Sequence, residues 1–148
     1  MSSKKSIPSL TPKVKICNYC NPQKFLKFNF TFAKENGNPS SKDAIKLLER
    51  LQFLSSKMYA VMIIEYQGDK KNFIEEIPIK KLNLKGGIPR EFRDIHPAET
   101  NEKYAIFRLY PAGSPPGTAN PRIIGMIKNT IFYIFYIDWK GTLYKHGK

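Results

Sequence analysis

Lys103-Tyr-Ala-Ile-Phe-Arg-Leu-Tyr110 opens the part of the chain that decides the fold. Its side chains alternate between two faces, which is typical of a β-strand. One face carries Tyr104, Ile106, Arg108 and Tyr110, and the other carries Ala105, Phe107 and Leu109. We therefore expect a strand over residues 103–110 that presents a charged side chain near its end.

Two more strands follow after a loop rich in proline and glycine, residues 111–121. Arg122-Ile-Ile-Gly-Met-Ile-Lys128 and Ile131-Phe-Tyr-Ile-Phe-Tyr-Ile137 are separated only by Asn129 and Thr130, which predicts a hairpin. The last stretch is apolar on both faces and rich in β-branched and aromatic residues. This composition indicates a central strand covered by helices on at least one side. The remaining elements must pack against this meander.

Upstream of the meander, the pattern predicts one strand and one helix. Phe28-Asn-Phe-Thr-Phe32 alternates strictly, so we expect a half-buried strand with three phenylalanines on one face. Ser40 or Ser41 is a suitable N-cap for a helix that runs through Leu54. The apolar stripe of this helix comprises Leu47, Leu51, Leu54 and Met58, and its solvated face comprises Lys42, Lys46, Glu49 and Arg50.

The segment between this helix and the meander is less regular. Met58 to Tyr66 fits either a strand or a second, antiparallel helix, and we favour the helix. An edge strand is expected near Ile77 to Leu82, because Pro78 lacks the N–H that a central strand requires. Residues 86–97 are expected to form a polar connection.

Residues 1–13 have little to bury and predict a flexible basic arm, followed by a short edge strand at Val14 to Cys17. Residues 14–148 are then a single domain, since about 150 residues suit one core. The predicted fold class is α+β. We expect an antiparallel sheet of about four to five strands with two helices packed on one face.

The net charge of +13 is concentrated at the two ends of the chain. Residues 1–34 carry seven lysines and no acid, and residues 122–148 carry five bases against Asp138 alone. If the first strand pairs with the meander, these ends form one positive surface, which favours a polyanion as partner. The alternative is that the lysine excess only keeps the protein in solution.

The sequence offers little for metal or cofactor chemistry. Cys17 and Cys20 form a single C-x-x-C, and a four-ligand zinc site with His96 and His146 has spacings that match no familiar finger. Glycine-rich phosphate-loop motifs are absent, and so are paired catalytic carboxylates. No cofactor is expected. Without an apolar membrane span or signal sequence, the expected location is the cytoplasm.

The order of elements, together with three stretches of sequence, resembles the RelE/ParE-type toxin superfamily. It is most similar to relatives from mobile elements that end in an FYI-ID-LY pattern. The stretches are Ser41-Lys-Asp-Ala-Ile-Lys-Leu-Leu-Glu-Arg-Leu51, Arg122-Ile-Ile-Gly125 and Thr130-Ile-Phe-Tyr-Ile-Phe-Tyr-Ile-Asp-Trp-Lys-Gly-Thr-Leu-Tyr144. The resemblance covers about residues 25–144, with a long insertion between the helices and the meander.

The resemblance implies a basic toxin, an endoribonuclease that cuts messenger RNA at the ribosome without a metal and has a cognate antitoxin. Other proteins of this fold bind gyrase and lack the RNA-cutting residues. By position, Arg108, Arg122 and Tyr144 match the basic and aromatic site residues of the family. Lys140 or Lys145 stands where another basic residue is expected. A typical member has an arginine in the segment after its last strand.

Cleavage of RNA by its own 2′-OH needs a base, an acid and cations for the phosphate. Arg108 and Arg122 are candidates to hold the phosphate, and Tyr144 or His146 to move the proton. Two aromatic residues, Tyr110 and Trp139, are candidates to stack on an RNA base. Three lysines are candidates to contact the RNA backbone: Lys128, Lys140 and Lys145.

Each candidate also has a purely structural interpretation. Arg108 could pair with a carboxylate such as Asp138 or Glu102, Tyr144 could belong to the core, and Trp139 could close the end of the sheet. The same basic face could equally bind a nucleic acid or a protein partner without cleaving it. A zinc-supported domain around Cys17 and Cys20 is the third alternative.

Overall fold

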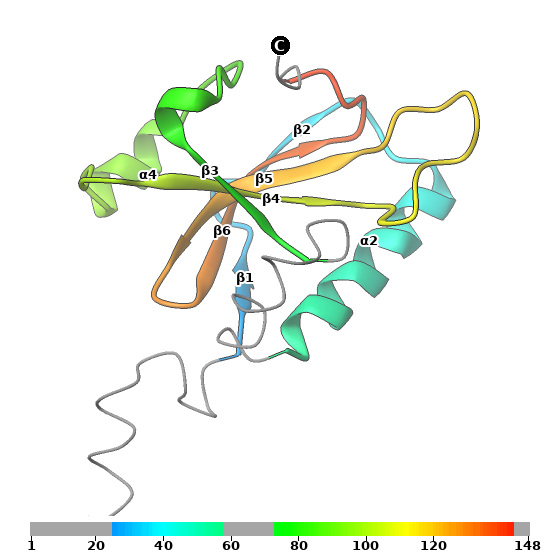
Figure 1. Ribbon diagram of the computed structural model, residues 1–148, viewed down its shortest axis with the longest axis horizontal. Coiled ribbons are helices and arrows are strands. Elements are labelled where there is room, and N and C mark those ends of the chain that lie inside the picture. The colour runs from blue at the N-terminus through cyan, green and yellow to red at the C-terminus, as the bar shows by residue number, and fades with distance from the viewer. Residues whose placement is uncertain (1–24, 58–72, 144–148) are drawn as a thin grey trace, which may run out of the picture.

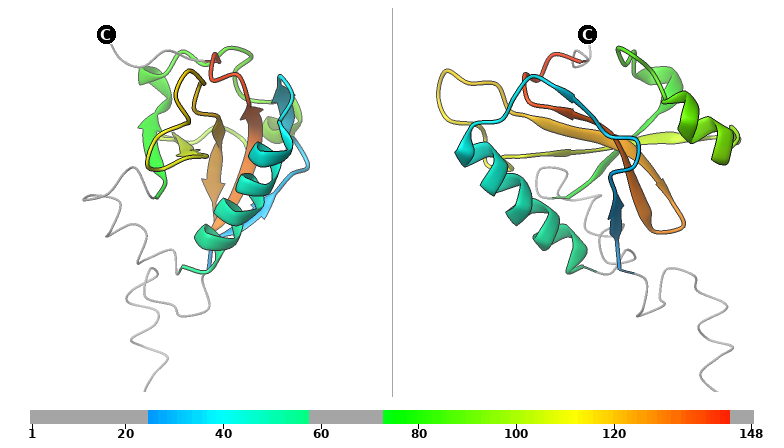
Figure 2. Two further views of the ribbon diagram at one scale, coloured as in Figure 1. Left: turned by 90° about the vertical axis from the view of Figure 1, so that its right-hand side faces the viewer. Right: turned by 180° about the vertical axis from the view of Figure 1, so that it is seen from behind.

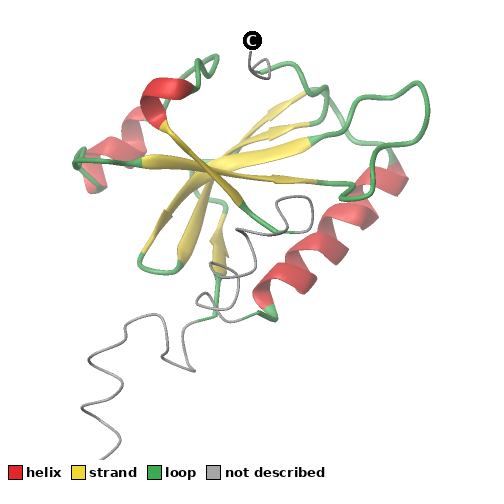
Figure 3. Ribbon diagram, in the orientation of Figure 1, coloured by secondary structure: helices red, strands yellow, loops and turns green. Residues whose placement is uncertain are grey.

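The computed structural model describes residues 25–57 and 73–143. This part of the chain is an α+β structure, as predicted, built on one six-stranded sheet (Figures 1 and 3). Its elements in chain order are β1 (Lys27–Asn29), β2 (Lys34–Asn36), α2 (Ser41–Ser55), β3 (Glu75–Pro78), the short 3-10 helix η2 (Ile79–Lys81), α4 (Arg90–Ile95), β4 (Lys103–Arg108), β5 (Arg122–Lys128) and β6 (Ile131–Asp138).

The sheet is mixed, with the strand order β1-β6-β5-β4-β3, and β2 also pairs with β6. The pairs β3–β4, β4–β5 and β5–β6 are antiparallel. β1 and β2 run parallel to β6. The expectation of a purely antiparallel sheet of four to five strands is therefore wrong at this edge. The pairing of an N-terminal strand with the meander was considered, but its parallel direction beside β6 was not anticipated.

The predicted meander is confirmed. β5 has the predicted bounds, β6 extends one residue further to Asp138, and β4 ends at Arg108, two residues early. Asn129 and Thr130 both have positive φ, 57° and 64°, as a tight two-residue hairpin turn requires. A bulge follows Ile124, where a Cβ on Gly125 would lie 1.9 Å from the carbonyl oxygen of Tyr133.

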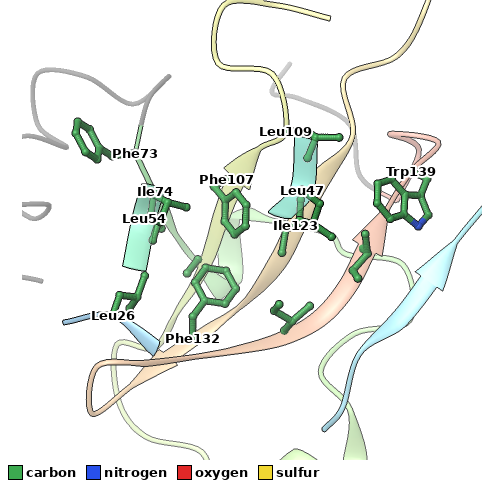
Figure 4. Close-up of a cluster of buried hydrophobic side chains, with 13 residues drawn as sticks. Leu26, Leu47, Leu54, Phe73, Ile74, Phe107, Leu109, Ile123, Phe132 and Trp139 are labelled. Atoms are coloured by element: carbon green, nitrogen blue, oxygen red, sulfur yellow. The ribbon is translucent and has the colours of Figure 1, made fainter. Parts of the chain in front are cut away.

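Two hydrophobic cores cover the two faces of the sheet. We call the first the α2 face (Figure 4); its buried side chains are Leu26, Leu47, Leu54, Phe73, Ile74, Ala105, Phe107, Leu109, Ile123, Phe132, Ile134, Ile137 and Trp139. We call the second the α4 face; its buried side chains are Leu82, Leu84, Phe92, Tyr104, Ile106, Ile124, Met126, Phe135 and Tyr136.

The two helices of the described residues thus lie on opposite faces, not on one face as expected (Figure 2). The difference arises in residues 86–97, where we expected only a polar connection. α4 forms there because Phe92 is fully buried against the rings of Phe32, Tyr133 and Phe135. A single large aromatic residue supplies enough apolar area to fix a six-residue helix against the sheet.

The strand predicted over Phe28 to Phe32 is interrupted, so its three phenylalanines do not share a face. β1 ends at Asn29, whose side-chain oxygen accepts a hydrogen bond from the Thr31 N–H (2.9 Å) and turns the chain. Phe28 packs on the α2 face, Phe32 packs on the α4 face, and Phe30 is 48% exposed. The alternation of apolar residues predicted burial, but it did not reveal the turn.

α2 agrees with the prediction over 41–54. The Ser40 hydroxyl caps it by accepting a hydrogen bond from the Asp43 N–H (3.0 Å), and Leu47 and Leu54 are buried. Arg50 is an exception, because we placed it on the solvated face and it is only 5% exposed. Its guanidinium lies over the ring of Phe107 on the sheet, so the helix buries it with the apolar stripe.

The edge strand β3 begins and ends earlier than predicted, and Pro78 is its last residue. Its place at the edge of the sheet is confirmed. Four expectations lie outside the described residues: the arm over 1–13, the strand at Val14 to Cys17, the element at Met58 to Tyr66, and the cysteine pair. None of the helices in the described part is long and apolar enough to span a membrane.

Candidate nucleic-acid-binding site

Arg108 and Arg122 lie directly opposite each other on the antiparallel strands β4 and β5. Side chains along each strand alternate between the two faces of the sheet. Ile106 and Ile124 lie on the α4 face, and Phe107 and Ile123 lie on the α2 face. Arg108 and Arg122 therefore lie on the α4 face. Like charges directly opposite each other destabilise a sheet. Both side chains are partly exposed, so together they present a concentrated positive charge to an anion.

Asp138 is the next residue in this row, opposite Arg122 on β6. Its carboxylate is 1% exposed and already accepts four hydrogen bonds, so it is committed to the end of its own strand. The donors are the side-chain amide of Asn36 (2.7 Å) and the backbone N–H groups of Gly141 (3.0 Å), Thr142 (3.2 Å) and Leu143 (3.0 Å).

The turn held by Asp138 directs the chain to the α4 face. Leu143 packs against the core of that face, and its carbonyl oxygen accepts a hydrogen bond from the Lys85 N–H (3.1 Å). Leu143, the last described residue, therefore lies on the same side of the sheet as Arg108 and Arg122. Three predicted site residues follow directly in sequence but lie outside the described residues: Tyr144, Lys145 and His146.

The backbone around Arg108 is fixed from the other side of the sheet. The Arg50 Nε–H donates to the Arg108 carbonyl oxygen (3.0 Å), and burial lowers the pKa of Arg50 to about 10. Asn120 exchanges two hydrogen bonds with the backbone of Tyr110, which closes the long loop between β4 and β5. These contacts maintain the register that brings Arg108 opposite Arg122.

Two of the aromatic residues predicted to stack on bases have roles within the fold. The Tyr110 hydroxyl donates to the Asp43 carboxylate (2.5 Å); burial, followed by this hydrogen bond, raises the pKa of Tyr110 to about 12. Trp139 is 8% exposed on the α2 face, and its Nε1–H donates to Glu35 (2.7 Å). Neither ring belongs to the face that carries the arginines. Both residues therefore fit the alternative in which they have structural roles.

The predicted lysines differ in their surroundings. Lys128 pairs with Glu99 (2.9 Å) and Glu102 (2.7 Å), so nearby acids neutralise much of its charge. Glu102 also pairs with Arg93, and hydrogen bonds from Arg93 and Lys128 lower its pKa to about 2. Lys140 is exposed, and its side chain passes over Gly37.

The expectation that Arg108 pairs with Asp138 or Glu102 is not met in the structure. Asp138 is occupied by other donors and Glu102 pairs with Arg93 and Lys128. Within residues 25–57 and 73–143, the Arg108 side chain makes no hydrogen bond or ion pair. Its charge is thus available to a ligand.

Sequence reasoning missed the cations of residues 79–90. This segment contains Lys80, Lys81, Lys85 and Arg90 and no acid, and its two buried leucines anchor it on the α4 face. The absence of acids was a usable signal. This signal is easy to miss, because the acids at 75 and 76 stand shortly before the lysines and make the segment look mixed in charge.

Comparison of the chain with models of known families, with curated proteins and with solved structures found no match. The described residues contain no group of three or more His, Cys, Asp or Glu side chains arranged to hold a metal ion.

Proposed function

We propose that this chain is an RNA-directed, toxin-like protein that binds messenger RNA on its α4 face, similar in kind to RelE/ParE toxins. The observation that supports this most strongly is the cross-strand pair Arg108 and Arg122. A folded protein gains nothing in stability from two arginines opposite each other. A phosphodiester placed between them would offset the repulsion and accept hydrogen bonds from both guanidinium groups.

Arginine suits this task better than lysine, because its planar group donates two parallel hydrogen bonds to one phosphate. The acid nearest in register, Asp138, is buried and satisfied, so it does not compete strongly with the ligand. The positive N-terminal and C-terminal segments add long-range attraction for RNA.

Cleavage is the activity that the resemblance implies. In that step a base removes the proton of a 2′-OH, whose oxygen attacks the adjacent phosphorus. The 5′-oxygen of the next nucleotide leaves and takes a proton from an acid, which yields a 2′,3′-cyclic phosphate and a 5′-OH. Arg108 and Arg122 would stabilise the crowded phosphorane, and Tyr144 or His146 would move the protons.

The second candidate is a module that binds nucleic acid or a protein partner without cleaving RNA. One observation favours it: Tyr110 and Trp139, the two candidates for stacking on a base, are engaged within the fold by hydrogen bonds to Asp43 and Glu35. A cognate antitoxin and the ribosome remain predicted partners under the first proposal.

Growth and RNA products distinguish these candidates. Expression of the wild-type chain should arrest growth, and Arg108→Ala combined with Tyr144→Phe should relieve the arrest. Purified protein, with and without ribosomes, should release RNA fragments that end in a 2′,3′-cyclic phosphate. Arrest that survives both changes contradicts the catalytic roles. Tight RNA binding without any fragments supports the non-catalytic candidate.

A further inference from the structure

Residues 81–85 cross the α4 face in a regular pattern of buried and exposed side chains, and the exposed Lys80 precedes them in η2. Leu82 and Leu84 are buried in the core of that face, whereas Lys81, Asn83 and Lys85 are exposed. Leu82 has extended backbone angles, φ −128° and ψ 115°. Alternation of this kind in an extended segment points its odd-numbered side chains outward together.

This segment is fixed in place at several points. The Ile79 N–H donates to the Glu102 carbonyl oxygen (3.3 Å), and the Lys85 N–H donates to Leu143 (3.1 Å). The Tyr136 hydroxyl donates to the Gly87 carbonyl oxygen (2.8 Å), and Gly86 lies so close to it that a Cβ would approach the same hydroxyl to 2.7 Å. The lysines therefore project from an anchored backbone.

A continuous set of contacts connects Lys85 to the end of the sheet that carries Arg122. Lys85 bonds to Leu143, Leu143 bonds to Asp138, and Asp138 lies opposite Arg122 in the sheet. Figure 1 shows the green segment after β3 and the C-terminal end of the described chain on the same side of the sheet, opposite α2. No acid occurs within residues 79–90, so this charge is not neutralised from within the segment.

From this arrangement we propose that Lys80, Lys81 and Lys85, here called the lysine ridge, form a second binding element for the backbone of single-stranded RNA. The proposal rests on the proposed function and extends it. The arginine pair holds the phosphate at the centre, and the ridge holds phosphates along the strand that leads away from it. Lysine suits this task, because a mobile point charge meets a flexible backbone without selecting a base.

Several alternatives are less well supported. Lysines on the surface are often only solvated, but these three stand on an acid-free segment that is anchored on the same face of the sheet as the arginine pair. An acidic protein would also be attracted. An extended run of cations anchored on one face suits a regularly spaced polyanion better.

The test is the salt dependence of binding to a fluorescent single-stranded oligouridine. The triple variant Lys80→Gln, Lys81→Gln, Lys85→Gln should lower the slope of log affinity against log salt by about 2, since each contact to a single strand contributes about 0.7. At about 0.1 M salt its Kd should rise on the order of 100-fold if all three lysines contact phosphates. The matching Lys→Arg triple variant should retain the affinity.

The control variant is Lys42→Gln, Lys46→Gln, Lys57→Gln, which removes the same charge from α2 and the residues after it. These lysines lie with the helix on the opposite side of the sheet, so less than about a 3-fold change in Kd is expected from net charge alone. Thermal melting of each variant verifies the fold.

Equal effects of the ridge and control variants on RNA affinity would overturn the proposed role of the lysine ridge. The proposed function would remain intact, provided that Arg108→Gln weakens RNA binding. Absence of RNA binding by the wild type would overturn both. Equal loss of affinity for oligouridine and for polyglutamate in the ridge variant would overturn its assignment to RNA. A weaker effect on oligothymidine than on oligouridine would support RNA as the ligand.

Discussion

Arg108 and Arg122 occupy directly opposed positions on adjacent strands, where their like charges repel each other. The two hydrogen bonds of Asn120 with the Tyr110 backbone hold the ends of β4 and β5 together, and the Arg50 side chain holds the Arg108 carbonyl oxygen. A local feature that costs stability inside a well-determined structure is best explained by a ligand. This relationship leads to opposite predictions for stability and for binding.

Replacing Arg108 with Gln should raise the free energy of unfolding or leave it unchanged, within about 0.5–1 kcal/mol, because it removes a like-charge contact. The same change should weaken RNA binding. Chemical denaturation and fluorescence anisotropy measure the two effects on one protein preparation. A variant that is destabilised by more than about 1 kcal/mol would indicate that Arg108 has a structural role instead.

Asp138 should be among the most sensitive polar residues of the described chain. Asp138→Ala leaves four donors without their acceptor, one side-chain amide and three backbone N–H groups, and should destabilise the fold by about 2–4 kcal/mol. Asn36→Ala removes only one of these donors and should cost about 1 kcal/mol. Because Asp138 also directs residues 141–143 to the α4 face, RNA affinity should fall in the first variant even where it remains folded.

Glu102 should make stability depend on pH in the acid range. Its folded-state pKa of about 2 is below the ordinary 4.5, so its contribution is fully present above about pH 4.5 and is lost as the pH falls toward 2. Glu102→Gln should therefore destabilise the protein by about 2–3 kcal/mol at pH 7 and flatten the pH dependence.

Glu99→Gln is the matched control, because Glu99 pairs with the same Lys128 from a side chain that is 71% exposed. It should change stability by less than about 1 kcal/mol. Equal effects of the two variants on urea unfolding curves would contradict the dominant role of Glu102.

Tyr110 should contribute stability that is lost in the alkaline range. Its pKa is raised from 10 to about 12, so the contribution is complete below about pH 10 and disappears as the pH rises through 12. Tyr110→Phe removes the hydrogen bond to Asp43 and should cost about 1 kcal/mol at pH 7. It should also abolish an absorbance titration near pH 12.

Tyr133→Phe is the control for Tyr110, since the Tyr133 hydroxyl makes no hydrogen bond within the described residues. A comparison of Tyr110→Leu with Tyr110→Phe examines the predicted stacking of Tyr110 on a base. Tyr110→Leu should leave RNA affinity close to that of Tyr110→Phe if the ring acts only within the fold. A further loss in the leucine variant would restore the stacking role.

The meander was predictable because its strands carry their signals locally. Alternation in 103–108, a two-residue turn at 129–130 and an uninterrupted apolar run in β6 each follow from short-range physics. The N-cap of α2 at Ser40 is local in the same sense. Most of what failed depended on contacts between distant residues, and the turn after Asn29 is a local exception.

Arg50 and Phe92 illustrate this limit. Arg50 is charged and has a helical position next to the apolar stripe, and only the approach of Phe107 and the Arg108 carbonyl makes its burial favourable. Phe92 stands in a polar segment, and only the distant rings of Phe32, Tyr133 and Phe135 turn that segment into α4. With α4 unforeseen, both helices were expected on one face.

The candidate site was predictable in part. Arg108 and Arg122 were identified from their strands, but their direct opposition required the register of β4 and β5. The internal hydrogen bonds of Trp139 and Tyr110 join residues that are far apart in sequence, so no local pattern could reveal them. The lysine ridge is the reverse case, because the absence of acids over 79–90 was visible in the sequence.

The central claim is that the paired arginines bind an RNA phosphate, and the salt dependence of binding tests it most directly. Affinity for a single-stranded oligouridine is measured over a range of salt for the wild type, Arg108→Gln with Arg122→Gln, and Lys42→Gln with Lys46→Gln. We predict that the arginine variant loses about 1.4 from the slope and binds about 25-fold more weakly at about 0.1 M salt, while the lysine control stays close to wild type. An arginine variant with the slope and affinity of the wild type would contradict the account.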